Sequence, residues 1–128
     1  MYLVAKLNYI YRERKGTLVA SDNKLLKQKI LTQFGVKESD LIRLCRKHGV
    51  KSLSVFGSLA HNEFKSGQSD IDLLVEFDSI SVDKFFDLQD GLKKLFHYEK
   101  IDLVTVASLK NKVIKQEILS SQKEIYAA

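Results

Sequence analysis

The chain has 128 residues, the length of one ordinary domain, and 45% of them are hydrophobic, so it can bury a core of its own. A single cysteine, Cys45, excludes an internal disulfide and a zinc site built on several cysteines. No apolar run reaches the ~20 residues needed to span a bilayer, and the N-terminus lacks the long apolar run of a secretory signal. We therefore expect a soluble, cytoplasmic protein without a membrane-spanning segment.

The net charge of +5 is distributed unevenly along the chain. Residues 1–51 contain 12 Lys and Arg against 4 Asp and Glu, whereas residues 52–128 contain 9 against 12. The basic part could contact a polyanionic ligand or an acidic partner, or it could simply be a solvated, lysine-rich surface. A nucleic-acid ligand is the less favoured interpretation, because it would require these charges to cluster on one face.

The first 20 residues mix apolar, aromatic and basic side chains, and either a short strand or a mobile arm fits them. We therefore divide the chain into an N-terminal arm, residues 1–20, and a single domain, residues 21–128. Ser21 or Asp22 is expected to cap a first helix that ends at Gly35. A second helix follows, with Ser39 as its expected cap and its end at Gly49, and Cys45 and His48 on its core-facing side.

The remainder of the chain alternates between apolar strands and amphipathic helices. Strands are predicted over residues 52–56, 70–77 and 101–106, with helices opened by Ser81 and by Ser108. This order predicts an α+β fold in which helices pack on one small mixed β-sheet.

The predicted strand over residues 70–77 places two carboxylates on one face. Because side chains alternate across a sheet, Asp70, Asp72, Leu74 and Glu76 point away from the core. Asp70 and Asp72 would repel each other unless a positive charge lies between them, and oxygen ligands of this kind suit Mg²⁺. The alternative is a solvent-exposed strand face, on which such a pair costs little free energy.

Two further features lie on either side of this pair. Gly57 and Ser58 end the preceding strand, where glycine permits a positive φ and successive backbone N–H groups can bind an anion; a plain turn is the alternative. Asp102 lies in an otherwise apolar strand. A lone buried carboxylate there would be costly, so Asp102 is either a third metal ligand or a solvent-exposed residue of an edge strand.

Together, Gly57-Ser58, the pair Asp70-x-Asp72 and the strand-borne Asp102 closely resemble the signature of the nucleotidyltransferase superfamily related to DNA polymerase β. The match is nearest to its minimal nucleotidyltransferase (MNT) branch and runs from about residue 41 to about residue 126. The resemblance implies the polymerase β palm-like nucleotidyltransferase fold. The sequence departs from the family after the Gly-Ser turn, where Ala60-His61-Asn62 replaces the usual Ala-Arg-Gly.

The resemblance implies an Mg²⁺-dependent transfer of AMP from ATP to a hydroxyl group. Asp70, Asp72 and Asp102 would hold two Mg²⁺ ions, Asp102 would also take the proton of the acceptor, and Gly57 and Ser58 would bind the β- and γ-phosphates. Small MNT proteins of this kind act with a helical HEPN-domain toxin, and they transfer AMP to a tyrosine of that toxin as its antitoxin. The resemblance therefore implies a HEPN-type partner and a hetero-oligomer, with a homo-oligomer as the other possibility.

Two alternatives stay open. The protein could be a binding module with an MNT fold that neutralises a partner by contact, since a neutral His61 replaces the arginine that would bind the triphosphate bidentately. It could also be a nucleotidyltransferase for a small molecule or for RNA. His61 itself is either a phosphate contact or a surface-loop residue.

Overall fold

The computed structural model describes residues 20–128. The predicted N-terminal arm, residues 1–20, lies outside the described part except for its last residue, where helix α2 begins. Within the described part, no helix has the length and apolar character needed to cross a membrane.

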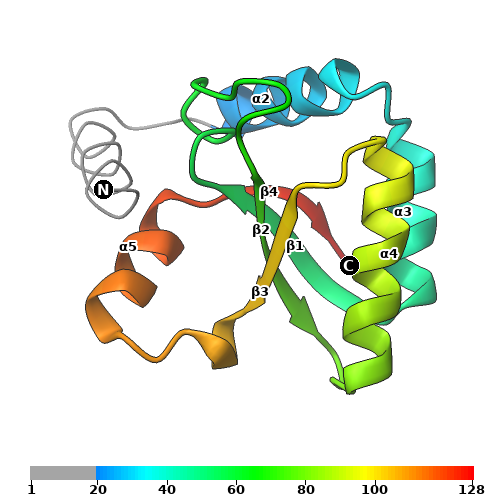
Figure 1. The fold of residues 1–128 in the computed structure, drawn as a ribbon, viewed down its shortest axis with the longest axis vertical. Coiled ribbons are helices and arrows are strands. Elements are labelled where there is room, and N and C mark those ends of the chain that lie inside the picture. Colours follow the sequence, from blue (N-terminus) through cyan, green and yellow to red (C-terminus); the bar gives the residue numbers. More distant parts are fainter. Residues whose placement is uncertain (1–19) are drawn as a thin grey trace.

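The core of the protein is one mixed four-stranded sheet with the strand order β3-β2-β1-β4 (Figure 1). β2 and β3 are parallel, whereas β1 is antiparallel to both β2 and β4. The mixed sheet with packed helices is therefore confirmed, and its C-terminal strand, which pairs with β1, was not predicted from the sequence. The strands are β1 (Val50–Phe56), β2 (Ile71–Phe77), β3 (Ile101–Thr105) and β4 (Lys123–Ala127), and the helices are α2 (Ala20–Gln33), α3 (Glu38–Lys47), α4 (Val82–Phe96), the short 3₁₀ helix η1 (Val106–Ser108) and α5 (Lys112–Ser121).

The two faces of the sheet carry cores of different size. Side chains of α2, α3 and α4 bury the larger core against one face, whose strand residues include Leu53, Val55, Leu73 and Val75. The opposite face carries a smaller cluster of Phe56, Leu74 and Ile118, to which α5 contributes. In Figure 1, α5 accordingly lies on the other side of the sheet from α3 and α4.

Helices α3 and α4 approach each other closely at Gly91. A Cβ atom at this position would lie 2.7 Å from Cδ1 of Leu44, so the absence of a side chain permits the contact. Cys45, on the same helix as Leu44, is completely buried, and this burial raises the pKa of its thiol to about 12. Cys45 is therefore a core residue, as its position in the helical pattern predicted.

The helix starts show which capping predictions were correct. Ser81 caps α4, and its side chain accepts a hydrogen bond from the Lys84 N–H. Ser39 was predicted wrongly, because α3 begins at Glu38 and its N-cap is Lys37. The prediction that Ser108 caps the last helix was also wrong. The Ser108 hydroxyl donates to the Thr105 carbonyl at η1, and Asn111 caps α5 instead.

The first helix also begins earlier than predicted. α2 starts at Ala20, one residue before Ser21 and two before Asp22, the two expected caps. Its end agrees with the prediction, because Gly35 follows in the left-handed conformation with φ 65°.

Candidate active site

A tight turn follows β1 at one end of the sheet. Gly57 begins it with φ 69°, a left-handed conformation that glycine permits. The Ser58 carbonyl closes the turn by accepting hydrogen bonds from the backbone N–H groups of His61 (3.2 Å) and Glu63 (3.0 Å). The turn therefore holds a short run of backbone in a fixed arc directly beyond the end of β1.

The same turn explains part of the departure from the family pattern. Asn62, which stands where the family has glycine, adopts a left-handed conformation with φ 58°, and asparagine tolerates this conformation better than most residues do. Its Oδ1 accepts a hydrogen bond of 2.7 Å from Nζ of Lys29, so α2 helps to hold the turn. His61 is half-buried in the middle of this turn.

Two of the predicted carboxylates lie directly opposite each other on neighbouring strands. Asp72 of β2 pairs with Asp102 of β3 in the parallel ladder, and on its other side it pairs with Phe56, the last residue of β1. Paired residues on neighbouring strands point to the same face and lie about 4.8 Å apart along the sheet. Asp70 comes two residues before Asp72, just ahead of β2.

The three carboxylates differ strongly in exposure. Asp72 is 1% exposed, whereas Asp70 and Asp102 are exposed. Asp72 makes other interactions, but its Oδ1 atom is buried and accepts no hydrogen bond from the described residues. The alternative of a solvent-exposed strand face is therefore wrong for Asp72, while Asp102 does lie exposed on an edge strand, as its alternative interpretation predicted.

The three carboxylates have the chemistry that a hard cation requires, but their side chains do not already converge on one point. Carboxylate oxygens are the protein ligands that Mg²⁺ takes, commonly one or two together with substrate phosphates. Across residues 20–128, however, no three His, Cys, Asp or Glu side chains already converge as a metal-binding group. The backbone brings Asp72 and Asp102 to one face of the sheet, with Asp70 just ahead of β2, and side-chain rotation has to complete any metal site.

Glu76 lies on the same side of β2 as Asp72 by strand alternation, but four residues further along the strand. It is exposed near the far end of β2, where its Oε1 lies 3.6 Å from Nζ of Lys51. Glu76 therefore belongs to a surface ion pair and not to the candidate site.

Sequence reasoning missed the residues that hold the loop between the turn and β2. The Tyr98 hydroxyl donates to the Ser69 carbonyl at 2.5 Å and accepts from the Gly67 N–H at 3.1 Å. Nζ of Lys100 donates to the Gly67 carbonyl at 3.0 Å. The signal available in the sequence was topological, because the segments that precede two adjacent parallel strands lie at the same end of the sheet.

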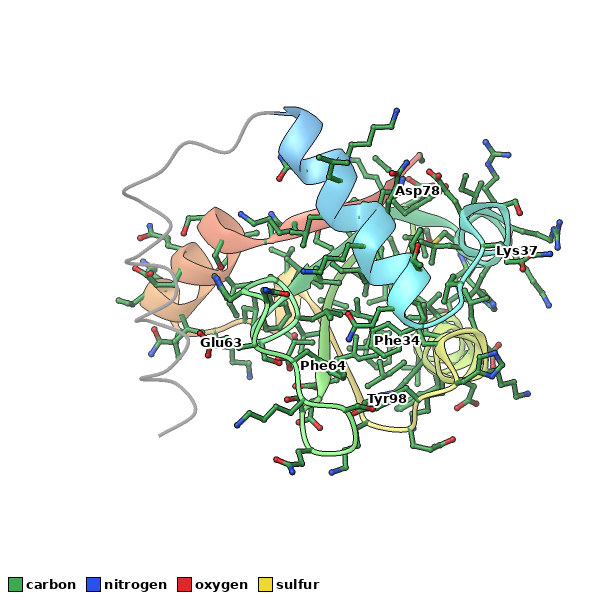
Figure 2. All side chains as sticks on the ribbon, turned by 90° about the horizontal axis from the view of Figure 1, so that it is seen from above. Phe34, Lys37, Glu63, Phe64, Asp78 and Tyr98 are labelled. Carbon is green, nitrogen blue, oxygen red and sulfur yellow. The ribbon has the colours of Figure 1, made fainter. Side chains whose placement is uncertain are left out.

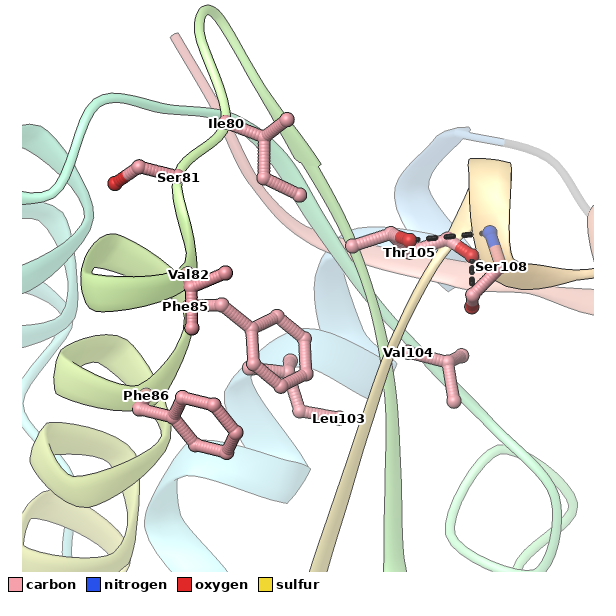
Figure 3. Close-up of a pocket in the computed structure, with 9 residues that line it drawn as sticks. All are labelled: Ile80, Ser81, Val82, Phe85, Phe86, Leu103, Val104, Thr105 and Ser108. Atoms are coloured by element: carbon pink, nitrogen blue, oxygen red, sulfur yellow. Dashed lines mark hydrogen bonds between the residues drawn. The ribbon is translucent and has the colours of Figure 1, made fainter.

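An apolar pocket opens beside β3 and α4 (Figure 3). It has a volume of about 500 Å³ and lies between the start of α4 and the later part of β3, with Val82, Phe85, Phe86, Leu103 and Thr105 in its lining. None of the predicted site residues lines it.

The glycine turn after β1 and the carboxylates of β2 and β3 are the features by which the sequence resembles one class of protein, the nucleotidyltransferases. The profile of the family described as "Polymerase beta, Nucleotidyltransferase" matches residues 39–128. The chain belongs to this family, and its fold class is confirmed. The class implies a nucleotide substrate.

Similar proteins carry a more specific name, protein adenylyltransferase. The chain is 46% identical over 76 residues to a candidate protein adenylyltransferase of Methanocaldococcus jannaschii, and the match covers 59% of this chain and 76% of that protein. It is 40% identical over 73 residues to the protein adenylyltransferase MntA of Thermococcus cleftensis, covering 56% of this chain and 72% of MntA.

Solved structures agree with the fold. A chain from the crystal structure of a toxin–antitoxin with AMP-PNP superposes with a TM-score of 0.57 at 22% identity, covering 73% of this chain and 75% of that one. A chain of a mutant MntA toxin–antitoxin complex gives a TM-score of 0.55 at 20% identity, with the same coverage. At this identity the similarity establishes the shared fold.

Proposed function

We propose that this protein is a protein adenylyltransferase that transfers AMP from ATP to a hydroxyl group, a tyrosine, of a HEPN-type toxin, and that it thereby acts as the antitoxin. The observation that carries the proposal is the pairing of Asp72 with Asp102 across β2 and β3, at the end of the sheet where the Gly57 turn lies. We place this activity in the cytoplasm, where ATP is available.

The similar proteins support the choice of acceptor. Two relatives with at least 40% identity are described as protein adenylyltransferases, and each is matched over more than two thirds of its length. The solved structures with the same fold come from toxin–antitoxin complexes, one of them with the ATP analogue AMP-PNP. A protein hydroxyl on a toxin partner is therefore better supported than a small molecule or RNA.

Mg²⁺ fits the carboxylates, and we assign it to them. Asp70 and Asp72 would hold one ion on the triphosphate, and Asp102 would complete the site for a second ion near the acceptor. When bound, the ions supply positive charge that offsets the negative charge of the phosphates in an in-line displacement. Buried Asp72 would be the fixed ligand of this set, and exposed Asp70 and Asp102 would be its adjustable ligands.

The transfer itself needs a positioned base. The acceptor oxygen forms a bond to the α-phosphorus, the bond from that phosphorus to the β-phosphate oxygen breaks, and pyrophosphate leaves. The hydroxyl proton passes to Asp102, which is exposed on the edge strand β3 among the described residues, where a macromolecular acceptor can approach it. The products are the AMP ester of the acceptor and pyrophosphate.

The turn at Gly57 and Ser58 would hold the β- and γ-phosphates. Its left-handed glycine lets the backbone approach an anion closely, and backbone N–H groups supply hydrogen bonds to phosphate oxygens. His61 lies in the same turn, where the family has arginine. A neutral imidazole cannot replace the bidentate guanidinium, so we expect weaker triphosphate binding than in relatives that keep the arginine.

The test uses ATP labelled on the α-phosphate. The full-length protein, Mg²⁺ and a lysate of the host cell are incubated with the label, and Asp72→Asn serves as the inactive variant. Asp87→Asn is the matched control, since Asp87 is exposed on α4, outside the candidate site. A labelled protein band with the wild type and Asp87→Asn, but not with Asp72→Asn, is the expected result.

Two other outcomes would replace the proposal. If ATP and Mg²⁺ bind but no protein is labelled, a small-molecule or RNA acceptor becomes the better assignment. If neither binding nor labelling is found, a contact-only antitoxin becomes the better assignment, a function that the missing arginine permits.

A further inference from the structure

We infer that Tyr98 is a positioning residue for the candidate active site, through which the loop before Asp70 is fixed relative to the strand that carries Asp102. The inference rests on the proposed function. Its first observation is that the Tyr98 hydroxyl makes two hydrogen bonds to one short loop, to the Ser69 carbonyl (2.5 Å) and from the Gly67 N–H (3.1 Å). Ser69 is the residue directly before Asp70.

The position of Tyr98 is itself well determined. Its backbone N–H donates to the Lys93 carbonyl at the end of α4, so the helix fixes the backbone position from which the ring extends. The ring packs against Phe34 and Phe64, with centroid separations of 5.9 and 5.4 Å. Figure 2 shows these three rings together, although they come from the end of α2, the loop before β2 and the segment after α4. A ring held on several sides can impose its position on the loop it contacts.

The same short segment also leads into β3. Tyr98 precedes Asp102 by four residues, and between them the Lys100 carbonyl accepts a hydrogen bond of 2.8 Å from the N–H of Ile71, the first residue of β2. Nζ of Lys100 adds the bond to the Gly67 carbonyl. The backbone on both sides of Asp70 is therefore tied to the segment that starts β3.

Asp70 depends on this arrangement more than the other two carboxylates do. Asp72 and Asp102 lie within strands, where the β2–β3 ladder sets their positions. Asp70 lies just outside β2 and is exposed, so the ladder does not fix it. The hydrogen bonds of Tyr98 act one residue before Asp70, and their loss should loosen this ligand while the sheet stays intact.

The test is Tyr98→Phe, which keeps the packed ring and removes only the hydroxyl. Tyr126→Phe is the matched control, because Tyr126 is buried in β4 and pairs with Leu53, outside the loop. Binding of Mn²⁺ in the presence of AMP-PNP is measured by electron paramagnetic resonance on the wild type and both variants. We expect about tenfold weaker Mn²⁺ binding for Tyr98→Phe alone, with a melting temperature within a few degrees of the wild type.

Two further measurements separate positioning from general stability. Amide exchange at Gly67 should become at least about tenfold faster in Tyr98→Phe, because this N–H loses its acceptor. In AMP transfer, the Mg²⁺ concentration for half-maximal rate should rise about tenfold, while kcat at saturating Mg²⁺ stays within about twofold. Lys100→Met, which removes an exposed bond to the same loop, should shift both quantities in the same direction by less.

The outcomes decide the inference even if the proposed function fails. Faster exchange at Gly67 with unchanged Mn²⁺ binding would overturn it, because Tyr98 would then only anchor the loop. A wild-type protein that binds Mn²⁺ with AMP-PNP but transfers no AMP would refute the proposed function alone, and the binding comparison would still decide the role of Tyr98. A wild type that binds no Mn²⁺ would refute both.

Discussion

Asp72 and Asp102 lie directly opposite each other in the parallel pair β2–β3, one buried and the other exposed. Like charges at opposed positions of a sheet lower its stability, and burial of a carboxylate adds a desolvation cost. The arrangement therefore lowers the stability of the free protein, and a bound cation would offset the repulsion between the two carboxylates. It follows that substitutions here should separate activity from stability.

Asp72→Asn should abolish AMP transfer while the protein keeps its fold. Asparagine has almost the same shape as aspartate but lacks the negative charge that binds the metal ion. Loss of the metal's stabilisation of the transition state is worth several kcal/mol, about a thousandfold in rate or more. The melting temperature should be unchanged or higher, because the buried charge is removed. Labelled-ATP transfer and thermal unfolding measure the two effects, with Asp87→Asn as the control, and full activity in Asp72→Asn would refute the metal-site assignment.

Asp102→Asn should slow the chemical step more than it weakens ATP binding. Asparagine cannot accept the proton of the acceptor hydroxyl, whereas Asp70 and Asp72 still hold the triphosphate in this variant. A general base contributes about 10²–10⁴-fold to a rate. Single-turnover transfer gives the rate and calorimetric titration with AMP-PNP and Mg²⁺ gives the affinity; equal losses in both would contradict a role on the acceptor side.

The left-handed conformation of Asn62 predicts a graded series of substitutions. Asn62→Gly removes the conformational strain but also the bond from Lys29, so its free energy of unfolding should stay within about 1 kcal/mol of the wild type. Asn62→Val should lower it by about 1–3 kcal/mol, because a β-branched residue fits this conformation poorly. Urea unfolding of the two variants compares them directly, and equal stability would argue against the strain.

The thiol of Cys45 predicts a loss of stability at alkaline pH. An unfolded cysteine has a pKa of about 8.5, whereas burial raises the pKa of Cys45 to about 12. Below the unfolded value the thiol is protonated in both states and its contribution is fully present. Between the two values only the unfolded chain loses the proton, so stability should fall as pH rises through this range. Urea unfolding from pH 8 to 11, compared with Cys45→Ala, isolates the effect.

Reactivity provides an independent check on the same residue. A buried, protonated thiol is a poor nucleophile, so native protein at pH 8 should react with iodoacetamide only at the rate of unfolding. Alkylation in urea should be complete within minutes. Rapid labelling of the native protein would show that Cys45 is accessible.

Two neighbouring positions on α4 should differ sharply in stability. Leu88 is completely buried, whereas Phe86 is 55% exposed beside the apolar pocket. Leu88→Ala should lower the free energy of unfolding by about 2–5 kcal/mol, because it leaves a cavity in the larger core. Phe86→Ala should cost less than about 1 kcal/mol, and chemical denaturation of both variants tests the placement of the helix.

The sequence predicted the sheet and its carboxylates well because both depend on local patterns. Alternation correctly placed Asp72 and Leu74 on one side of β2, and Gly57 adopts the positive φ that glycine permits. Burial was not predictable in the same way. Asp72 is buried because Phe56 lies beside it and α5 contributes to the cluster on that face, and neither neighbour follows from the strand itself.

The errors have two physical causes, which are competition between nearby residues for one role and dependence on partners that are distant in the sequence. Ser108 and Asn111 could both cap α5, and η1 occupies the hydroxyl of Ser108. β4 pairs with β1, whose residues lie roughly seventy positions earlier in the chain, and a strand defined by so distant a partner has a weak local signal. Tyr98 was missed for the same reason, since its partners Gly67 and Ser69 lie in another loop.

The two unequal cores on the two faces of the sheet have an evolutionary consequence. The larger core contains none of the three carboxylates, so a substitution at Asp70, Asp72 or Asp102 leaves most of the folding energy untouched. A descendant could therefore lose its chemistry in one mutational step and persist as a well-folded, inactive paralogue. Among proteins of this fold, activity has to be inferred from the carboxylates themselves, since preservation of the scaffold carries no information about them.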